Sequence, residues 1–202
     1  MTDMRHKTTQ TLWTYFNLVR EEEEVPLRSA IDPVALKTVL PDLFILELAQ
    51  HGDLRFRLAG TRLCAMMGRE LRGLSFSGIF SSSRRHKMGL AGQTVLTTRQ
   101  PALANVWLRV NDDEREEIEL MMLPLASAPG QVDRIFGSVA RFTPGEPPML
   151  QNPLFDVQAI RFLHPGEDGL ATPESRPAEA RIFAASPERM RRFTVIEGGR
   201  RF

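Results

Sequence analysis

The chain has 202 residues, of which 42% are hydrophobic, and this length suits one domain with extensions better than two full domains. Its 26 Lys and Arg residues nearly balance its 25 Asp and Glu residues, so the overall charge gives no general attraction to nucleic acid or to an anionic membrane. The single cysteine excludes an intramolecular disulfide. Because no long apolar run or signal core is found, we expect a cytoplasmic protein without membrane insertion.

The first predicted element is an amphipathic helix over residues 8–24. Its apolar side chains recur at helical spacing along one side; they are Leu12, Tyr15, Phe16 and Val19. Further along, Asp32 followed by Pro33 is a typical helix start, because aspartate caps a helix and proline fits its first turn. We therefore expect a short second helix over 34–40.

Two strands are predicted next, over 42–49 and 54–59, because apolar and polar residues alternate in both. The four residues between them contain Gly52 and indicate a hairpin turn. In the second strand we expect Phe56 and Leu58 to point into the protein. The two arginines of that strand then point outward and match the negative charge of the first strand.

Helices follow the hairpin. A short one over 61–67 ends at a glycine, and a longer one over 82–98 begins at three serines. The longer helix carries a narrow stripe of small and apolar residues, which lets it lie close to a sheet. Three more alternating segments predict strands over 102–110, 115–126 and 133–142, with a turn at Gly130 before the last.

We divide the chain into three regions. Residues 1–31 form the N-terminal helix and a connector, and residues 32–143 form the core. Residues 144–202 begin with a proline-rich linker, hold one possible strand or helix over 154–163, and end in a largely irregular tail.

The order of these elements resembles that of a PAS domain, whereas the pattern alone indicates only the α+β class. The stretches LPDLFILEL and LRFRLAGTRLCAMMGRELRGLSFSGIF are similar to a family of small bacterial single-PAS-domain proteins, over residues 5 to 165. The resemblance implies an α+β, PAS-like five-stranded antiparallel sheet with helices on one face. It also implies a module that senses signals or binds proteins in bacterial regulation, has no output domain of its own, and acts by binding.

In PAS domains a ligand, when present, lies between the sheet and the long helix. The resemblance therefore places candidate ligand-contacting side chains on the inner face of the sheet and on the helices. They are Phe56, Leu58, Cys64, Met67, Phe80, Met88, Val106 and Leu108. A filled core has the same composition as an apolar pocket, so a small apolar ligand and a filled interior both stay open, and no cofactor is identified.

Specific cofactor and catalytic chemistry finds little support. His86 lies away from the apolar stripe of its helix and is expected to face water, which argues against heme ligation. Cys64 lacks the neighbours that flavin photochemistry needs. The four histidines are scattered, and no metal or hydrolase motif is present. We expect a non-catalytic protein without a metal; a small enzyme using Cys64 or a pocket histidine is the alternative.

The outer face of the sheet predicts an interface. Alternation leaves Trp107, Met121 and Leu123 on this face, where an apolar patch needs a cover. We expect the cover to be the apolar side of the N-terminal helix, that is Leu12, Tyr15, Phe16 and Val19. The helix comes either from the same chain or from a second copy in a homodimer. A nucleic-acid adaptor that uses the basic end of the tail is a third function class, and the balanced charge argues against it.

Overall fold

The computed structural model describes residues 4–20, 25–110, 114–147, 150 and 152–163. All of them belong to the first of two units, Met1–Leu170. The second unit, Ala171–Phe202, lies outside the described residues, and so does the predicted irregular tail with its basic end.

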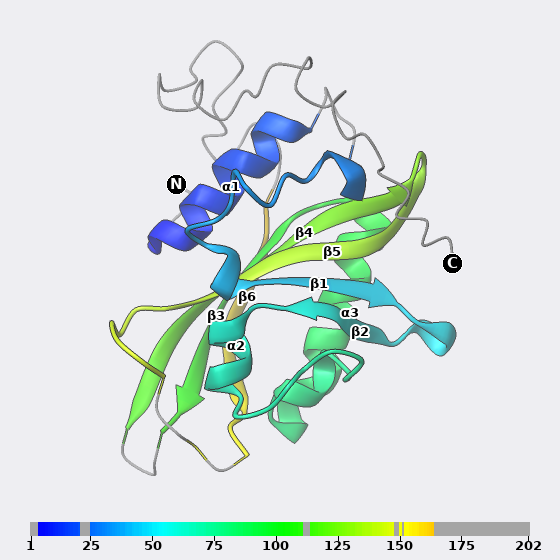
Figure 1. Ribbon diagram of the computed structural model, residues 1–202. Coiled ribbons are helices and arrows are strands. Elements are labelled where there is room, and N and C mark those ends of the chain that lie inside the picture. The colour runs from blue at the N-terminus through cyan, green and yellow to red at the C-terminus, as the bar shows by residue number, and fades with distance from the viewer. Residues whose placement is uncertain (1–3, 21–24, 111–113, 148–149, 151, 164–202) are drawn as a thin grey trace, which may run out of the picture. The chain divides into compact units, whose positions relative to one another are not determined.

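One antiparallel sheet of six strands organises this unit (Figure 1). The strand order is β2-β1-β5-β4-β3-β6. The strands are β1 (Leu43–Leu48), β2 (Leu54–Ala59), β3 (Ala102–Arg109), β4 (Arg115–Ala128), β5 (Gln131–Arg141) and β6 (Phe155–Phe162). The five predicted strands are confirmed. The sixth falls in the segment for which the sequence left strand and helix open, and it pairs with β3 at the edge of the sheet.

The two hairpin turns depend on glycine. Gly52 has a φ of +79° in the turn between β1 and β2, and Gly130 has a φ of +76° in the turn between β4 and β5. Residues with a Cβ are strained in this region, whereas glycine is not. Both predicted turns are confirmed.

Helices lie on both faces of the sheet (Figure 1). The α-helices are α1 (Lys7–Val19), α2 (Thr61–Met66) and α3 (Ser82–Thr98), and the short 3-10 helices are η1 (Arg28–Ala30), η2 (Leu40–Asp42), η3 (Gln50–Gly52) and η4 (Ser77–Ile79). We call the face against α2, η4 and α3 the inner face and the face against α1 the outer face. Each face has its own buried apolar cluster.

The expected helix over 34–40 is wrong. The cap is present, since Val34 N donates to Asp32 Oδ1 at 2.8 Å, but the segment forms successive turns that end in η2. Most of its backbone hydrogen bonds join residues three apart, as Leu36 N to Pro33 O does at 3.2 Å. Seven residues with several β-branched side chains are too few to offset the free energy of helix nucleation.

The long helix carries a small residue where it packs against the sheet. A Cβ on Gly92 would lie 2.3 Å from Leu54 Cδ1 of β2, so a larger residue would require the Leu54 side chain to move. The helix has the predicted bounds, and its small-residue stripe faces the inner cluster.

Candidate functional site

The inner cluster holds a group of phenylalanines in ring-to-ring contact, which we call the phenylalanine row. It consists of Phe44, Phe56, Phe76, Phe80 and Phe155. Neighbouring ring centroids are 5.2 to 6.0 Å apart, and each side chain is at most 1% exposed. Aromatic rings at these distances pack mostly edge to face and fill the interior densely.

Six of the eight predicted ligand-contacting side chains lie in the inner cluster. They are Phe56, Met67, Phe80, Met88, Val106 and Leu108. Cys64 is partly buried and packs against the same cluster. The structure thus brings seven of the residues together, and binding of a ligand among them stays a prediction.

The eighth prediction is wrong, because Leu58 points outward and is 46% exposed. The register between β1 and β2 shifts between Ile45 and Leu46, which leaves Arg57 as an extra residue in β2. Such a β-bulge interrupts the alternation of side chains. Beyond the bulge Ala59, and not Leu58, packs against the inner cluster.

Cys64 lies beside a carboxylate. Its Sγ is 3.7 Å from Glu70 Oε1 and 3.9 Å from the carbonyl oxygen of Ala59. Burial raises the pKa of the Cys64 thiol, and the negative charge of Glu70 acts in the same direction. A thiol in these surroundings is mostly protonated at neutral pH and is a poor nucleophile.

The two histidines whose side chains the structure describes, His6 and His86, lie on different helical segments. His86 is exposed on α3, as expected, and His6 caps α1, where its Nδ1 accepts from Thr8 N at 3.1 Å. The side chain of His51 and all of His164 lie outside the described residues. Within the part of the chain that the structure describes, no three His, Cys, Asp or Glu side chains are grouped so that they can hold a metal ion.

A buried ion pair closes one end of the inner face, and the sequence analysis missed it. Arg141 Nε and Nη2 donate to the two carboxylate oxygens of Glu116, each at 2.7 Å, and Arg141 Nη1 donates to the Gly145 carbonyl at 3.2 Å. The two side chains are 4% and 10% exposed. Strict alternation places Glu116 on the same face as Ile118, and this signal was available in the sequence.

The outer face is covered by α1 of the same chain. Leu12, Tyr15 and Phe16 are buried in one cluster with Met121 and Leu123 of β4, and Val19 packs against it. Trp107 does not belong to this cluster; it is half-buried, and the Arg115 guanidinium lies 5.1 Å from its ring. The predicted cover therefore protects β4 and leaves Trp107 in part open.

A buried carboxylate fastens the start of α1 to the sheet. Glu119 is fully buried on the outer face of β4 and accepts from the backbone N–H groups of Arg5 at 3.0 Å and His6 at 3.1 Å. Arg5 also forms an ion pair with Glu117. The negative charge of this carboxylate also interacts favourably with the positive end of the α1 helix dipole.

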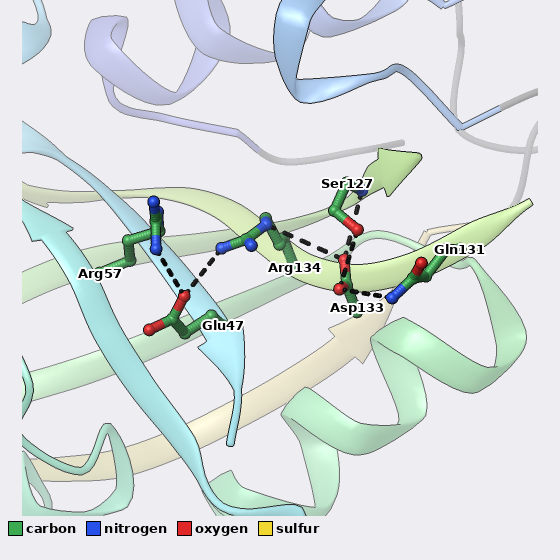
Figure 2. A network of polar contacts seen from close by, with 6 residues as sticks. All are labelled: Glu47, Arg57, Ser127, Gln131, Asp133 and Arg134. Carbon is green, nitrogen blue, oxygen red and sulfur yellow. Dashed lines mark hydrogen bonds and ion pairs between the residues drawn. The ribbon is translucent and has the colours of Figure 1, made fainter. Parts of the chain in front are cut away.

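Figure 2 shows a polar network that connects β1, β2 and β5. Glu47 Oε2 of β1 accepts from Arg57 Nη1 at 3.0 Å and from Arg134 Nη1 of β5 at 2.9 Å. The hydrogen bond from Arg134 lowers the pKa of the Glu47 carboxyl, and Arg57 adds to this effect. Arg57 is the extra residue of the β-bulge, so the bulge helps to join three strands by charge.

Three buried side-chain atoms among the described residues have no hydrogen-bond partner. They are Thr9 Oγ1, Arg134 Nε and Ser138 Oγ. Arg134 Nε is 3.9 Å from Asp133 Oδ1, which is an ion-pair distance but too long for a hydrogen bond. Thr9 belongs to α1, and the other two residues lie on the outer face of β5.

The chain is similar to a known protein family and to several solved structures. The sequence model described as PAS domain matches residues 4–140. Among solved structures, the chain is similar to a light-oxygen-voltage (LOV) domain from a flavin-analogue study, with 16% identity and a TM-score of 0.42, covering 55% of this chain and 83% of that chain.

Two further solved structures are similar. For a LOV protein of Rhodobacter sphaeroides the identity is 14% and the TM-score 0.40, covering 55% of this chain and 69% of that chain. For a variant of RsLOV the identity is 15% and the TM-score 0.38, covering 69% of this chain and 70% of that chain. A search of curated proteins finds no match. Among the helices of the described residues, none is long and apolar enough to span a membrane.

Proposed function

The chain belongs to the PAS domain family, and from this premise we propose that it is a non-catalytic signalling module that acts through contacts with proteins. The phenylalanine row is the observation that carries this proposal. It fills part of the inner cluster, where a ligand is otherwise expected, with five rings that are each at most 1% exposed. A large cofactor would have to displace these rings.

The partner side of the proposal concerns the outer face. Because Trp107 is only half-buried and α1 leaves it in part open, we propose that it contributes to a homodimer contact or to the contact with another protein in bacterial cytoplasmic regulation. The positively charged Arg115 over the ring gives this surface both an apolar and a cationic group.

A small apolar ligand is the competing proposal for the same interior. Four methionines of the inner cluster, Met66, Met67, Met88 and Met122, are flexible enough to repack around one. An enzyme using Cys64 is less well supported, because its thiol has a raised pKa.

One experiment tests these proposals together. Native mass spectrometry of the purified chain, compared with its denatured mass and visible absorption spectrum, reports bound molecules, colour and subunit number. We expect a colourless protein without added mass that forms dimers, and fewer dimers for Trp107→Glu. A stoichiometric bound molecule would overturn the filled interior, and an unchanged dimer fraction in Trp107→Glu would overturn the proposed contact.

A further inference from the structure

A groove runs along α3 on the surface, and its floor includes one member of the phenylalanine row, Phe76. It lies between one side of α3, the turn after β1 and η4, and its volume is about 480 Å³. Pockets that bind small molecules have volumes in this range. The groove is half open, so a molecule can enter it without any rearrangement of the interior.

Three residues of α3 form the long side of the groove. Arg85, Gly89 and Gln93 are four residues apart and therefore lie in one line along the helix. Gln93 Nε2 donates to the Gly52 carbonyl at 3.0 Å, which closes one end. Arg85 stands at the other end, and Gly89 leaves a gap between them.

The gap at Gly89 has no structural explanation within the described residues. Gly92, on the same helix, packs closely, because a Cβ there would lie 2.3 Å from Leu54 Cδ1. A Cβ on Gly89 would meet nothing within 4 Å. Glycine inside a helix is less stable than alanine. Packing therefore explains Gly92 but not Gly89, and Gly89 keeps the groove open.

The polar groups of the groove offer donors and no free carboxylate. Asp53 is engaged, since its Oδ1 accepts from Ser75 Oγ at 2.8 Å and its Oδ2 is 3.3 Å from Arg55 Nε. The exposed side chains of Arg85 and His86 have no hydrogen-bond or ion-pair partner among the described residues.

The remaining lining is apolar. Leu90 is 49% exposed, and Leu54 and Phe76 form part of the floor. We propose that this groove binds a small amphipathic carboxylate, whose head group is held by Arg85 and His86 and whose apolar chain lies across Gly89 toward Leu90. An arginine fork matches the two oxygens of a carboxylate.

Isothermal titration of the full chain with sodium decanoate, below its micellar concentration, tests the proposal. We expect saturable one-to-one binding, weakened at least about tenfold by Arg85→Glu, which reverses the charge, and by Gly89→Leu, which fills the gap. Lys87→Glu is the control: it makes the same change of charge on the same helix, but Lys87 does not line the groove. Its affinity should stay within about threefold of the original, since exposed charges are screened.

Thermal unfolding of the same variants separates binding from folding. Because the space at Gly89 is open, Gly89→Ala and Gly89→Leu should raise Tm, even though the second weakens decanoate binding. A lower Tm for Gly89→Ala would show that packing requires the glycine and would overturn the inference. Absence of decanoate binding, equal binding by Gly89→Leu, or equal losses in Lys87→Glu and Arg85→Glu would also overturn it.

The groove and the proposed function are tested separately. Native mass spectrometry without added ligand examines the interior and the subunit number, whereas the decanoate titration examines the surface of α3. Either proposal can be overturned while the other stands.

Discussion

The inner and outer faces of the sheet are both buried, but they differ in how completely their buried polar groups are hydrogen-bonded. At the inner face the interior is aromatic, and its ion pair between Glu116 and Arg141 is joined by two hydrogen bonds of 2.7 Å. The three buried side-chain atoms without a hydrogen-bond partner among the described residues all belong to α1 or to the outer face.

This difference indicates that the two layers differ in stability. An unpaired buried polar group costs about 1 to 3 kcal/mol. The contact between α1 and the outer face therefore carries a destabilisation that the described contacts of the inner face lack. Parts of a protein with lower local stability open before the rest unfolds. We therefore expect α1 to detach from the sheet more readily than α3.

The largest effect is expected in the phenylalanine row. Phe76 contacts three other rings of the row, and Phe76→Ala should lower the free energy of unfolding by about 3 to 5 kcal/mol in urea denaturation. Phe16→Ala, in α1, is the matched variant and should cost less, because α1 can detach while the sheet stays folded. An equal or larger loss for Phe16→Ala would break the comparison.

Removing one half of the buried ion pair comes next. Arg141→Met leaves the Glu116 carboxylate buried without its partner and should destabilise the protein by about 3 to 5 kcal/mol, toward the lower end if water reaches the site. The double variant Glu116→Leu with Arg141→Met should recover most of this loss. Failure of the double variant to recover would show that the pair is needed for more than charge balance.

Smaller effects of opposite sign are expected at the unpaired hydroxyls. Thr9→Val and Ser138→Ala each remove a buried hydroxyl without a partner and should raise the free energy of unfolding by about 1 kcal/mol. Ser75→Ala is the control, since its hydroxyl donates to Asp53 at 2.8 Å, and it should destabilise. If Thr9→Val and Ser138→Ala also destabilise, the two faces do not differ as described.

The smallest effect concerns pH and the network of Figure 2. Because the folded protein lowers the pKa of Glu47, this group stabilises the fold above its ordinary pKa, and the contribution is lost as pH falls through the folded value. The pair is partly exposed, so the effect should be below about 1 kcal/mol. Glu47→Gln should flatten the acid side of a stability-against-pH curve, and an unchanged slope would contradict this.

The candidate sites were predictable where they depend on alternation within one strand. Alternation placed Val106 and Leu108 on the inner face and Met121 and Leu123 on the outer face, and the structure has them there. It failed for Leu58, because the β-bulge at Arg57 arises from pairing with β1, which β2 alone does not reveal.

The groove on α3 was not predictable in the same way. Its lining comes from residues 52–54 and from residues 76–93, and the sequence does not distinguish a glycine that packs closely, such as Gly92, from one that leaves space, such as Gly89. Only the neighbouring elements decide between the two.

By itself the sequence determined the elements that arise from local periodicity and turn chemistry: five strands, the bounds of α3, and the hairpin turns at Gly52 and Gly130. Tertiary structure decided the rest. It added β6 to the edge of β3 and docked α1 on the sheet of its own chain. These outcomes depend on free energies of contact between distant segments, and no local pattern contains them.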